Sequence, residues 1–292
     1  MPEGDTVHNL AARLRPVLAG NVLTACDIRV PRYAGVDLTG RTVGSVTARG
    51  KHLLIDADGA VIHSHLKMEG QWHVYRPGER WRRPAHTARA VLAVAGAQVV
   101  GFSLGKLEVL TPAEADGALA HLGPDPLGPD WNPARVAANL AAEPGRPVGL
   151  ALLDQRILAG VGNVYRNELC FLSGAHPATP VEGCGDLRAL AGDAARLLRA
   201  NLGHGRRVTT GVDRNGMRAR GAASGPAHFV YDRARRPCLR CGTAIVAGSL
   251  GGAGDPERTI WWCPRCQPQQ ARRRFHRDQP VGRVRGAGGD GS

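Results

Sequence analysis

The sequence contains no apolar run that approaches the roughly eighteen residues of a membrane span, and its start carries no hydrophobic segment typical of a signal peptide. We therefore expect a protein without a membrane segment that stays in the cytoplasm. Acidic residues are also scarce, with 25 of them against 38 lysines and arginines, which gives a formal net charge of +13. Such a basic chain favours a polyanionic partner, nucleic acid before an anionic membrane surface.

Cysteine is too sparse for a disulfide framework, and the chain holds an odd number, seven. Four of the seven form two C-x-x-C pairs about twenty residues apart, the pattern of the tetrahedral four-thiolate site of a zinc ribbon. Four thiolates leave no open coordination position, so we expect one structural Zn²⁺ held by Cys238, Cys241, Cys263 and Cys266. We expect the other three to be free thiols: Cys26, Cys170 and Cys184.

The first half of the chain changes from helical to strand periodicity. Residues 5–20 carry apolar side chains at helical spacing, with Asp5 or Thr6 as the expected N-cap and Gly20 as the stop. From residue 21 to 110 the period becomes two, which suits a β-sandwich or flattened barrel with the first helix packed against it. The predicted strands are 22–30, 43–49, 52–56, 60–66, 90–95, 97–103 and 106–110, with 72–89 as a loop.

Residues 121–133 contain four prolines and two glycines, which mark a linker between two domains. Helices are predicted after this linker, over 133–142, 147–154, 164–172 and 185–203. The segment 203–228 holds many Gly and Arg residues and few apolar ones, so we expect a long loop that is mobile when nothing is bound. The chain after Cys266 has no apolar period and is predicted to be a disordered basic tail.

Two reactive residues stand at the start of the chain. Removal of Met1 would make Pro2 the amino terminus and place a secondary amine beside the carboxylate of Glu3. A terminal α-amine has a reference pKa of about 8 against about 10.4 for lysine, so far more of it is neutral and nucleophilic at pH 7. An amine beside a carboxylic acid is suited to attack a sugar or carbonyl carbon through a Schiff base. A capped first helix without chemistry is the alternative interpretation.

Two further segments of the first half carry candidate functional residues. Lys51 follows Gly50 at a predicted strand-to-strand turn, where it is either a solvated charge or a functional group. Met68 lies near the tip of the loop that follows His63 and His65, and it is either core filler or a wedge for a base stack. The two histidines have no third ligand at suitable spacing, so we interpret them as structural rather than as a metal pair.

The second half contains a glycine-rich turn, Gly160-Val-Gly162-Asn163, just before a predicted helix. Its backbone N–H groups are free to face an anion, although an ordinary turn between helices would have the same composition. The insert between the two cysteine pairs predicts a β-hairpin, from which Arg258 can reach a phosphate.

Taken together, residues 2–267 resemble the formamidopyrimidine-DNA glycosylase/endonuclease VIII (Fpg/Nei) family. The continuation after Pro-Glu is similar to the endonuclease VIII branch, because the 8-oxoguanine branch typically continues with Leu-Pro. The matching motifs are Pro2-Glu3-Gly4, Gly50-Lys51, His65-Leu66-x-Met68-x-Gly70, Leu122-Gly-Pro-Asp-Pro-Leu127, Leu153-Asp-Gln155 with Gly160-Val-Gly-Asn163-Val-Tyr165, and the run from Val230-Tyr231 to Cys266-Gln267.

The resemblance implies a role for each matching residue. Pro2 would be the nucleophile that attacks C1′ of the damaged nucleotide and displaces the base, and Glu3 would protonate the deoxyribose ring oxygen. Lys51 would contact the phosphate beside the lesion and help the base to leave. Asn163 and Arg258 would grip the backbone on either side of the flipped nucleotide.

Met68 aligns with the wedge that refills the base stack in this family. β-Elimination and δ-elimination would then cut the strand on both sides of the lost sugar. Lys67 and Glu69, beside the wedge, and the loop 203–228 give no clear match to a lesion pocket. Base preference is therefore the part of the function that the resemblance specifies least.

The resemblance also implies an α+β chain of two domains and a partner, damaged DNA. We expect a bacterial, nucleoid-associated monomer that removes oxidised bases, pyrimidines first. The alternatives are an 8-oxoguanine/formamidopyrimidine-preferring glycosylase, and a non-catalytic zinc-ribbon DNA-binding protein, which the intact Pro2, Glu3 and Lys51 argue against. The predicted parts are an N-terminal β-sandwich catalytic domain with a packed helix (1–121), a linker (122–131), a helix-two-turn-helix DNA-binding domain (132–230), a zinc finger hairpin (231–267) and the tail (268–292).

Overall fold

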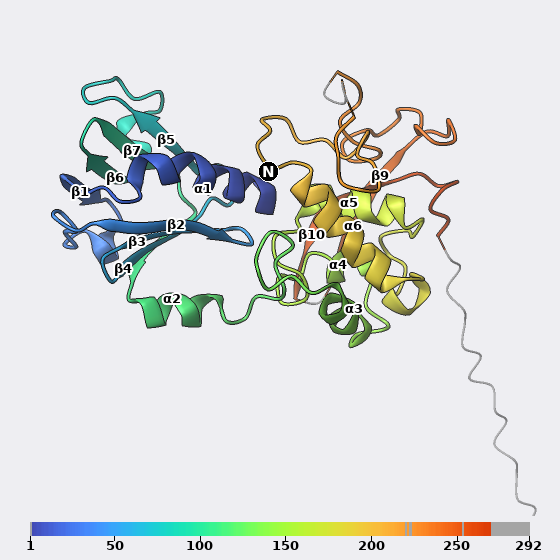
Figure 1. Cartoon of the computed structure of the whole chain (residues 1–292). Helices are drawn as coiled ribbons and strands as arrows, with labels where there is room; N and C mark the ends of the chain where they lie inside the picture. Colours follow the sequence, from blue (N-terminus) through green and yellow to red (C-terminus); the bar gives the residue numbers. More distant parts are fainter. Residues whose placement is uncertain (1, 220, 222–223, 253, 270–292) are drawn as a thin grey trace, which may run out of the picture.

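The computed structural model describes residues 2–219, 221, 224–252 and 254–269, and Figure 1 shows them as two lobes. The N-terminal lobe, blue to green, consists of strands, one long helix and one short helix, whereas the C-terminal lobe, green to red, is mostly helical. Within these ranges no helix is long and apolar enough to cross a membrane. The tail predicted over 268–292 lies outside the described residues from position 270 onward.

The N-terminal lobe is a sandwich of two four-stranded antiparallel sheets. Helix α1 (Gly4–Leu18) packs on β2, and its apolar stripe closes one common core with the inner faces of the sheets. One sheet has the order β1 (Ala25–Ile28), β6 (Ala88–Val94), β7 (Ala97–Phe102), β5 (Gln71–Tyr75); the other has β2 (Val43–Arg49), β3 (His52–Ala57), β4 (Ala60–His65), β8 (Lys106–Leu110). Short 3₁₀ turns occupy Pro31–Tyr33 and Ala85–Thr87.

The first helix begins one position earlier than predicted. Its N-cap is Glu3, so the prediction of Asp5 or Thr6 as the cap is wrong. The Thr6 hydroxyl, one turn into the helix, accepts a hydrogen bond from the Glu3 N–H at 3.2 Å, which fixes the entry of the chain. The capping residue is therefore also the candidate acid.

Strand β5 corrects the prediction of a loop over 72–89. Trp72 lies in the core shared with α1, whereas Tyr75 packs against Phe102 on the opposite face, and both side chains are buried. Because both faces of this strand are covered, it lacks the alternation that marks a half-buried strand. The sequence analysis also omitted helix α2 (Pro112–Leu119), which begins with a capping box of Thr111 and Glu114.

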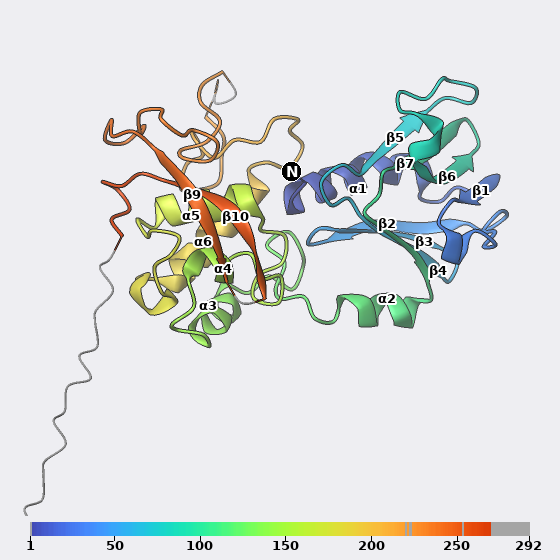
Figure 2. The same cartoon turned by 180° about the vertical axis from the view of Figure 1, so that it is seen from behind.

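The C-terminal lobe is arranged around α5 (Asn163–Leu172), whose residues are nearly all buried. Helix α6 (Leu187–Arg199) packs on α5 and on α3 (Pro133–Ala141), while α4 (Val148–Ala151) is shorter than the predicted 147–154. The hairpin of β9 (Val246–Gly252) and β10 (Asp255–Trp262) crosses α5, as Figure 2 shows. A 3₁₀ turn covers Val181–Gly183.

The described residues of the segment 203–228 form no helix or strand, as predicted. Parts of it are nevertheless held firmly in the lobe. Val208 and Thr209 are buried, and the Thr209 hydroxyl donates to the carboxylate of Glu168 on α5. That carboxylate also accepts the backbone N–H groups of residues 229, 230 and 231, so one buried acid fixes both ends of the loop.

Candidate active site

Pro2 lies at the junction of the two lobes, directly before the N-cap of α1 (Figure 1). It is half-buried and lines a cavity of about 570 Å³. Polar and apolar groups contribute to its wall in similar measure, and Met68 is among the lining residues: Pro2, Asp5, Thr6, Asn9, Leu10, Arg13, Leu66, Met68, Gly70, Gln71, Trp72, His73, His204, Gly205 and Arg207. A small planar group could therefore enter beside the candidate nucleophile.

Glu3 is completely buried and docks on the glycine turn of the other lobe. Its carboxylate accepts hydrogen bonds from the backbone N–H groups of Gly162 at 2.9 Å, Val164 at 2.7 Å and Tyr165 at 3.4 Å. The sequence left open whether this turn faces an anion or is an ordinary turn between helices; it binds the Glu3 carboxylate. Helix α5 begins at Asn163 with Gly162 as the N-cap, so the carboxylate lies at the positive end of the helix.

Arg207 reaches this site from the 203–228 segment. Its guanidinium donates to Asp5 at 2.8 and 2.6 Å and to the Thr6 hydroxyl at 2.7 Å, and it lies 3.9 Å from a Glu3 oxygen. It also lies over the Tyr165 ring, 5.1 Å from the centroid. This role could not be predicted from the sequence. Arg207 is about two hundred residues away from Asp5 along the chain, and it is one of several arginines in the same polar segment.

Lys51, Asn163 and Arg258 line a second cavity, of about 370 Å³, with Gly162 between them. Burial lowers the pKa of Lys51 to about 8; the Glu3 carboxylate opposes this shift, and the Arg258 guanidinium adds to it. At pH 7 such a lysine is still mostly protonated, yet a far larger fraction of it is neutral than of a solvated lysine. Three residues that the sequence singled out from distant segments are thus brought together.

Strand β10, which carries Arg258, is attached to α5 by polar contacts. The carbonyl of Thr259 accepts hydrogen bonds from the Asn163 side chain at 3.2 Å and from Arg166 at 2.8 Å. Two residues further along β10, the Trp261 N–H donates to Asn167 at 2.9 Å. These contacts set the distance between Asn163 and the hairpin, so the position of Arg258 depends on the hairpin staying folded.

Met68 is 60% exposed, in contrast to the buried Leu66 two residues before it. Lys67 adopts a left-handed conformation with φ of 53°, which turns the chain at this tip. An exposed methionine at a loop tip is consistent with the predicted wedge and excludes the core-filler alternative. Its insertion into a base stack stays a prediction.

His52 on β3 and His63 on β4 form a hydrogen-bonded chain rather than a metal site, and His65 accepts the Lys67 N–H at 2.9 Å. His52 and His63 are joined at 2.8 Å between Nδ1 and Nε2, and His63 Nδ1 contacts Glu108 at 3.1 Å. Burial lowers the pKa of His52 to about 3 and that of His65 to about 4, so both rings are neutral at pH 7. The interpretation of His63 and His65 as structural agrees with this arrangement.

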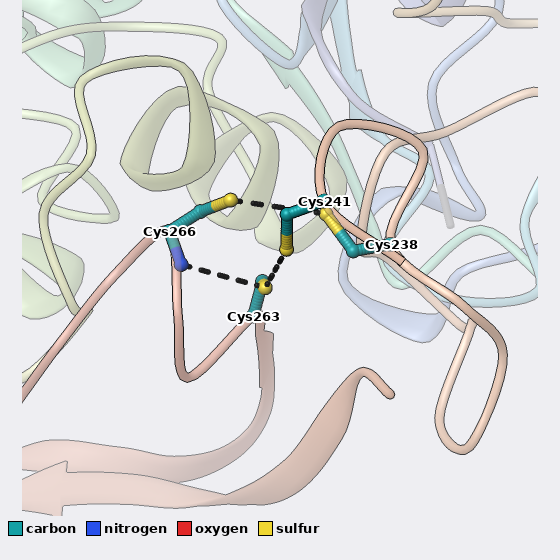
Figure 3. Close-up of side chains that lie close together, drawn as sticks. All are labelled: Cys238, Cys241, Cys263 and Cys266. Atoms are coloured by element: carbon teal, nitrogen blue, oxygen red, sulfur yellow. Dashed lines mark hydrogen bonds between the residues drawn. The ribbon is translucent and has the colours of Figure 1, made fainter. Parts of the chain in front are cut away.

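The four cysteines of the two C-x-x-C pairs converge next to the end of β10, which Cys263 directly follows (Figure 3). Their Sγ atoms all lie within 4.8 Å of one another, with 3.9 Å between Cys238 and Cys266 and 3.4 Å between Cys241 and Cys263. A tetrahedron of thiolates at about 2.3 Å from a metal requires S···S separations of this size, so the donor set fits a structural metal. In the described part of the chain, no other group of three or more His, Cys, Asp or Glu side chains is placed to share an ion.

Two family models match the chain. The model described as "Formamidopyrimidine-DNA glycosylase N-terminal domain" matches residues 1–103, and "Formamidopyrimidine-DNA glycosylase H2TH domain" matches residues 122–211. The first covers the helix and most of the sandwich, and the second begins at the linker and includes α3 to α6.

Curated relatives match over nearly the full length. The chain is 51% identical to "Probable endonuclease 8 2" of Streptomyces coelicolor, over 94% of this chain and 96% of the relative. It is 50% identical to "DNA-(apurinic or apyrimidinic site) lyase Nei2" of Mycolicibacterium smegmatis, over 91% and 99%. Among solved structures, a complex of Lactococcus lactis Fpg with abasic-site DNA has a TM-score of 0.74 at 22% identity, covering 91% of this chain and all of the other.

Proposed function

Because the chain belongs to the formamidopyrimidine-DNA glycosylase/endonuclease VIII family, we propose that Pro2, Glu3 and Lys51 carry out the reaction of a bifunctional DNA glycosylase and abasic-site lyase of base excision repair. The observation that supports these roles best is the junction of the lobes. There the candidate nucleophile directly precedes an acid that is fixed by three backbone N–H groups of the opposite lobe. A lysine with a pKa of about 8 lies close enough to interact with that acid.

The first chemical step is a displacement at the sugar. Once Met1 is removed, the Pro2 nitrogen forms a bond to C1′ while the bond between C1′ and the base breaks, and the base leaves with a proton from the Lys51 ammonium. The Glu3 carboxylate takes the proton that the Pro2 nitrogen loses on attack and passes it to the deoxyribose ring oxygen, which opens the ring and leaves an iminium at C1′. We propose that Lys51, mostly protonated at pH 7, assists the departing base and contacts the flanking phosphate.

The iminium then activates the sugar for strand cleavage. It withdraws electrons from C1′, so loss of the C2′ proton expels the 3′-phosphate by β-elimination. A second loss of a proton expels the 5′-phosphate by δ-elimination, and water then releases the sugar fragment from Pro2. Both cuts use the same covalent intermediate, which is why one terminal amine serves both activities.

The DNA is held by groups from both lobes. We propose that Lys51, Asn163 and Arg258 bind the backbone on the two sides of the flipped nucleotide, and that Met68 enters the space it leaves. We propose that the four thiolates hold one Zn²⁺, which would fix the hairpin that presents Arg258. The protein is expected to act as a monomer, with the sandwich, linker, helical domain and zinc hairpin bounded as the sequence predicts.

Glu3→Gln should reduce base removal by about 100-fold or more, the contribution of a general acid, and should spare cleavage at a pre-formed abasic site. The physical reason is that the open-chain aldehyde of an abasic site is attacked by Pro2 without protonation of a ring oxygen. Single-turnover rates on a damaged-base duplex and on an abasic-site duplex would separate the two steps. Equal losses on both substrates would contradict the assignment of Glu3 as the acid.

The matched control for this variant is Glu168→Gln. Glu168 is also fully buried and also accepts three backbone N–H groups, but from residues 229, 230 and 231 rather than from the glycine turn that holds Glu3. An amide in either place leaves a backbone N–H facing an NH₂ group, so both variants should lose stability. Only Glu3→Gln should change the ratio of base removal to abasic-site cleavage.

We propose that saturated or oxidised pyrimidines such as thymine glycol are excised about tenfold faster than 8-oxoguanine. A saturated ring is not planar and stacks poorly, so it flips at lower cost than 8-oxoguanine, which stacks nearly as well as guanine. The segment 203–228, which contributes Arg207 to the Pro2 cavity, contains no Phe, Tyr or Trp that could clamp a purine.

Single-turnover rates on matched duplexes with each lesion opposite its normal partner would test this preference. Faster release of 8-oxoguanine opposite cytosine would overturn the pyrimidine preference and leave the reaction class intact.

A further inference from the structure

Asp125 is a buried carboxylate at the centre of the linker between the lobes. It belongs to the Leu122–Leu127 motif, and its side chain is 1% exposed. A charged group at such a depth requires hydrogen-bonding partners that offset its desolvation. Its partners show what this acid does, because they come from two segments of the opposite lobe.

The carboxylate accepts hydrogen bonds on both oxygens. Oδ2 takes the Gly50 N–H at 2.6 Å and lies 3.3 Å from Nε2 of His8 on α1, whereas Oδ1 takes the Leu127 N–H at 2.9 Å. Burial opposes ionisation, but the hydrogen bonds from His8, Gly50 and Leu127 outweigh it and lower the pKa of Asp125. The group is therefore an anion at neutral pH that holds the β2–β3 turn and α1 at one point.

The turn that Asp125 holds has no room to move toward the second lobe. Gly50 has φ of 55°, and a Cβ on it would lie 3.2 Å from the Ala159 side chain and 3.3 Å from the Gly160 nitrogen. Gly160 is in turn packed against Gly4, whose N–H donates to the Gly160 carbonyl at 2.9 Å. Three glycines from three segments therefore meet with Asp125 beside them, and Lys51 is the next residue after one of them.

We propose that Asp125 is the positioning residue for Lys51: by binding the Gly50 N–H it fixes the β2–β3 turn against the glycine turn, so that the Lys51 side chain stays in the cavity it shares with Asn163 and Arg258. This inference rests on the proposed role of Lys51. The other acid of the linker that contacts this turn is Asp130, which pairs with Arg49 at 3.2 Å, but both side chains are more than a third exposed. A pair so exposed contributes little to position.

Asp125→Asn should lower single-turnover base removal by roughly 10- to 100-fold, the range expected for loss of a hydrogen bond to a charged group. Asparagine has one acceptor where aspartate has two, so the Gly50 or the Leu127 N–H would face an NH₂ group. Asp130→Asn, in the same linker, is the matched control and should change the rate less than twofold.

A double-mutant cycle with Lys51→Ala tests whether Asp125 acts through the lysine. If it does, Asp125→Asn added to Lys51→Ala should cause no further loss of base removal. Additive losses, with both variants folded, would assign Asp125 to general stability and overturn the proposal. A Lys51→Ala protein with the wild-type rate would contradict the proposed function of Lys51. In that case the pKa of Lys51 in Asp125→Asn still tests whether Asp125 positions the lysine.

The titration of Lys51 reports its position without any activity assay. The chain has three lysines, Lys51, Lys67 and Lys106, so ¹³C-labelled lysine gives three side-chain signals that single substitutions assign. In Asp125→Asn the pKa of Lys51 should rise from about 8 toward 10.5, because a displaced turn exposes the ammonium. Loss of a nearby negative charge alone would shift it the opposite way. An unchanged or lower Lys51 pKa in the folded variant would overturn the proposal.

Discussion

Borohydride reduction of the protein with abasic-site DNA should give a covalent adduct whose attachment point is Pro2. Few other amines compete with Pro2, since the chain has only three lysines. Lys51 is the strongest competitor, because its pKa of about 8 leaves part of it neutral and nucleophilic. Peptide mapping of the reduced adduct therefore distinguishes the terminal amine from a lysine without ambiguity. An adduct on Lys51 would transfer the nucleophile role to the hairpin and contradict the proposed mechanism.

Blocking the terminus should reduce trapping and strand cleavage to background, because an acylated or extended Pro2 has no nucleophilic lone pair. The clean comparison is one protein with a retained N-terminal extension and one with the same extension at the C-terminus. Pro2→Gly keeps a terminal amine but makes it primary, so part of the lyase activity should survive. Normal trapping by the N-terminally extended protein would show that the terminal amine is not the nucleophile.

The parts of the site that could be predicted are those carried by short, local patterns. The C-x-x-C pairs, the Gly50-Lys51 turn and the glycine turn before Asn163 each have a local backbone or ligand requirement that the residue types state directly. Their meeting in one place is a property of the fold, and it was predicted only through the family resemblance. The structure places Lys51, Asn163 and Arg258 around one cavity.

The contacts that could not be predicted join side chains far apart in sequence. Arg207 binds Asp5, and Asp125 binds the Gly50 N–H; nothing in the neighbouring residues of either pair specifies its partner. The sequence did not predict strand β5 for a related reason. Trp72 and Tyr75 are buried on opposite faces of the strand, which removes the two-residue alternation of apolar and polar side chains on which strand prediction depends. In each case the tertiary contact determines the local structure.

Removal of the metal should weaken binding to a duplex with an uncleavable abasic-site analogue by about 100-fold or more, because metal binding at such a site is folding free energy for the hairpin. The cysteines belong to a small core with Phe171, Val230 and Ile245, which is too small to persist without the metal. Intact-mass measurement of bound zinc, tryptophan fluorescence of Trp261 and Trp262, and the Kd for the analogue should change together during chelation.

We also expect that removal of the metal affects the reaction at Pro2 only by weakening DNA binding. When β10 detaches from α5, the Asn163 side chain loses its hydrogen bond to the Thr259 carbonyl, and Arg258 is no longer held near Asn163. Glu3 keeps the hydrogen bonds that it accepts from the Gly162 and Val164 N–H groups. At saturating DNA, the zinc-free protein should therefore still form the Pro2 adduct. Cys241→Ser should reproduce the binding defect, whereas Cys26→Ser, a half-buried thiol outside the cluster, should not. Full binding with no zinc in the intact mass would rule out a structural metal at these four cysteines.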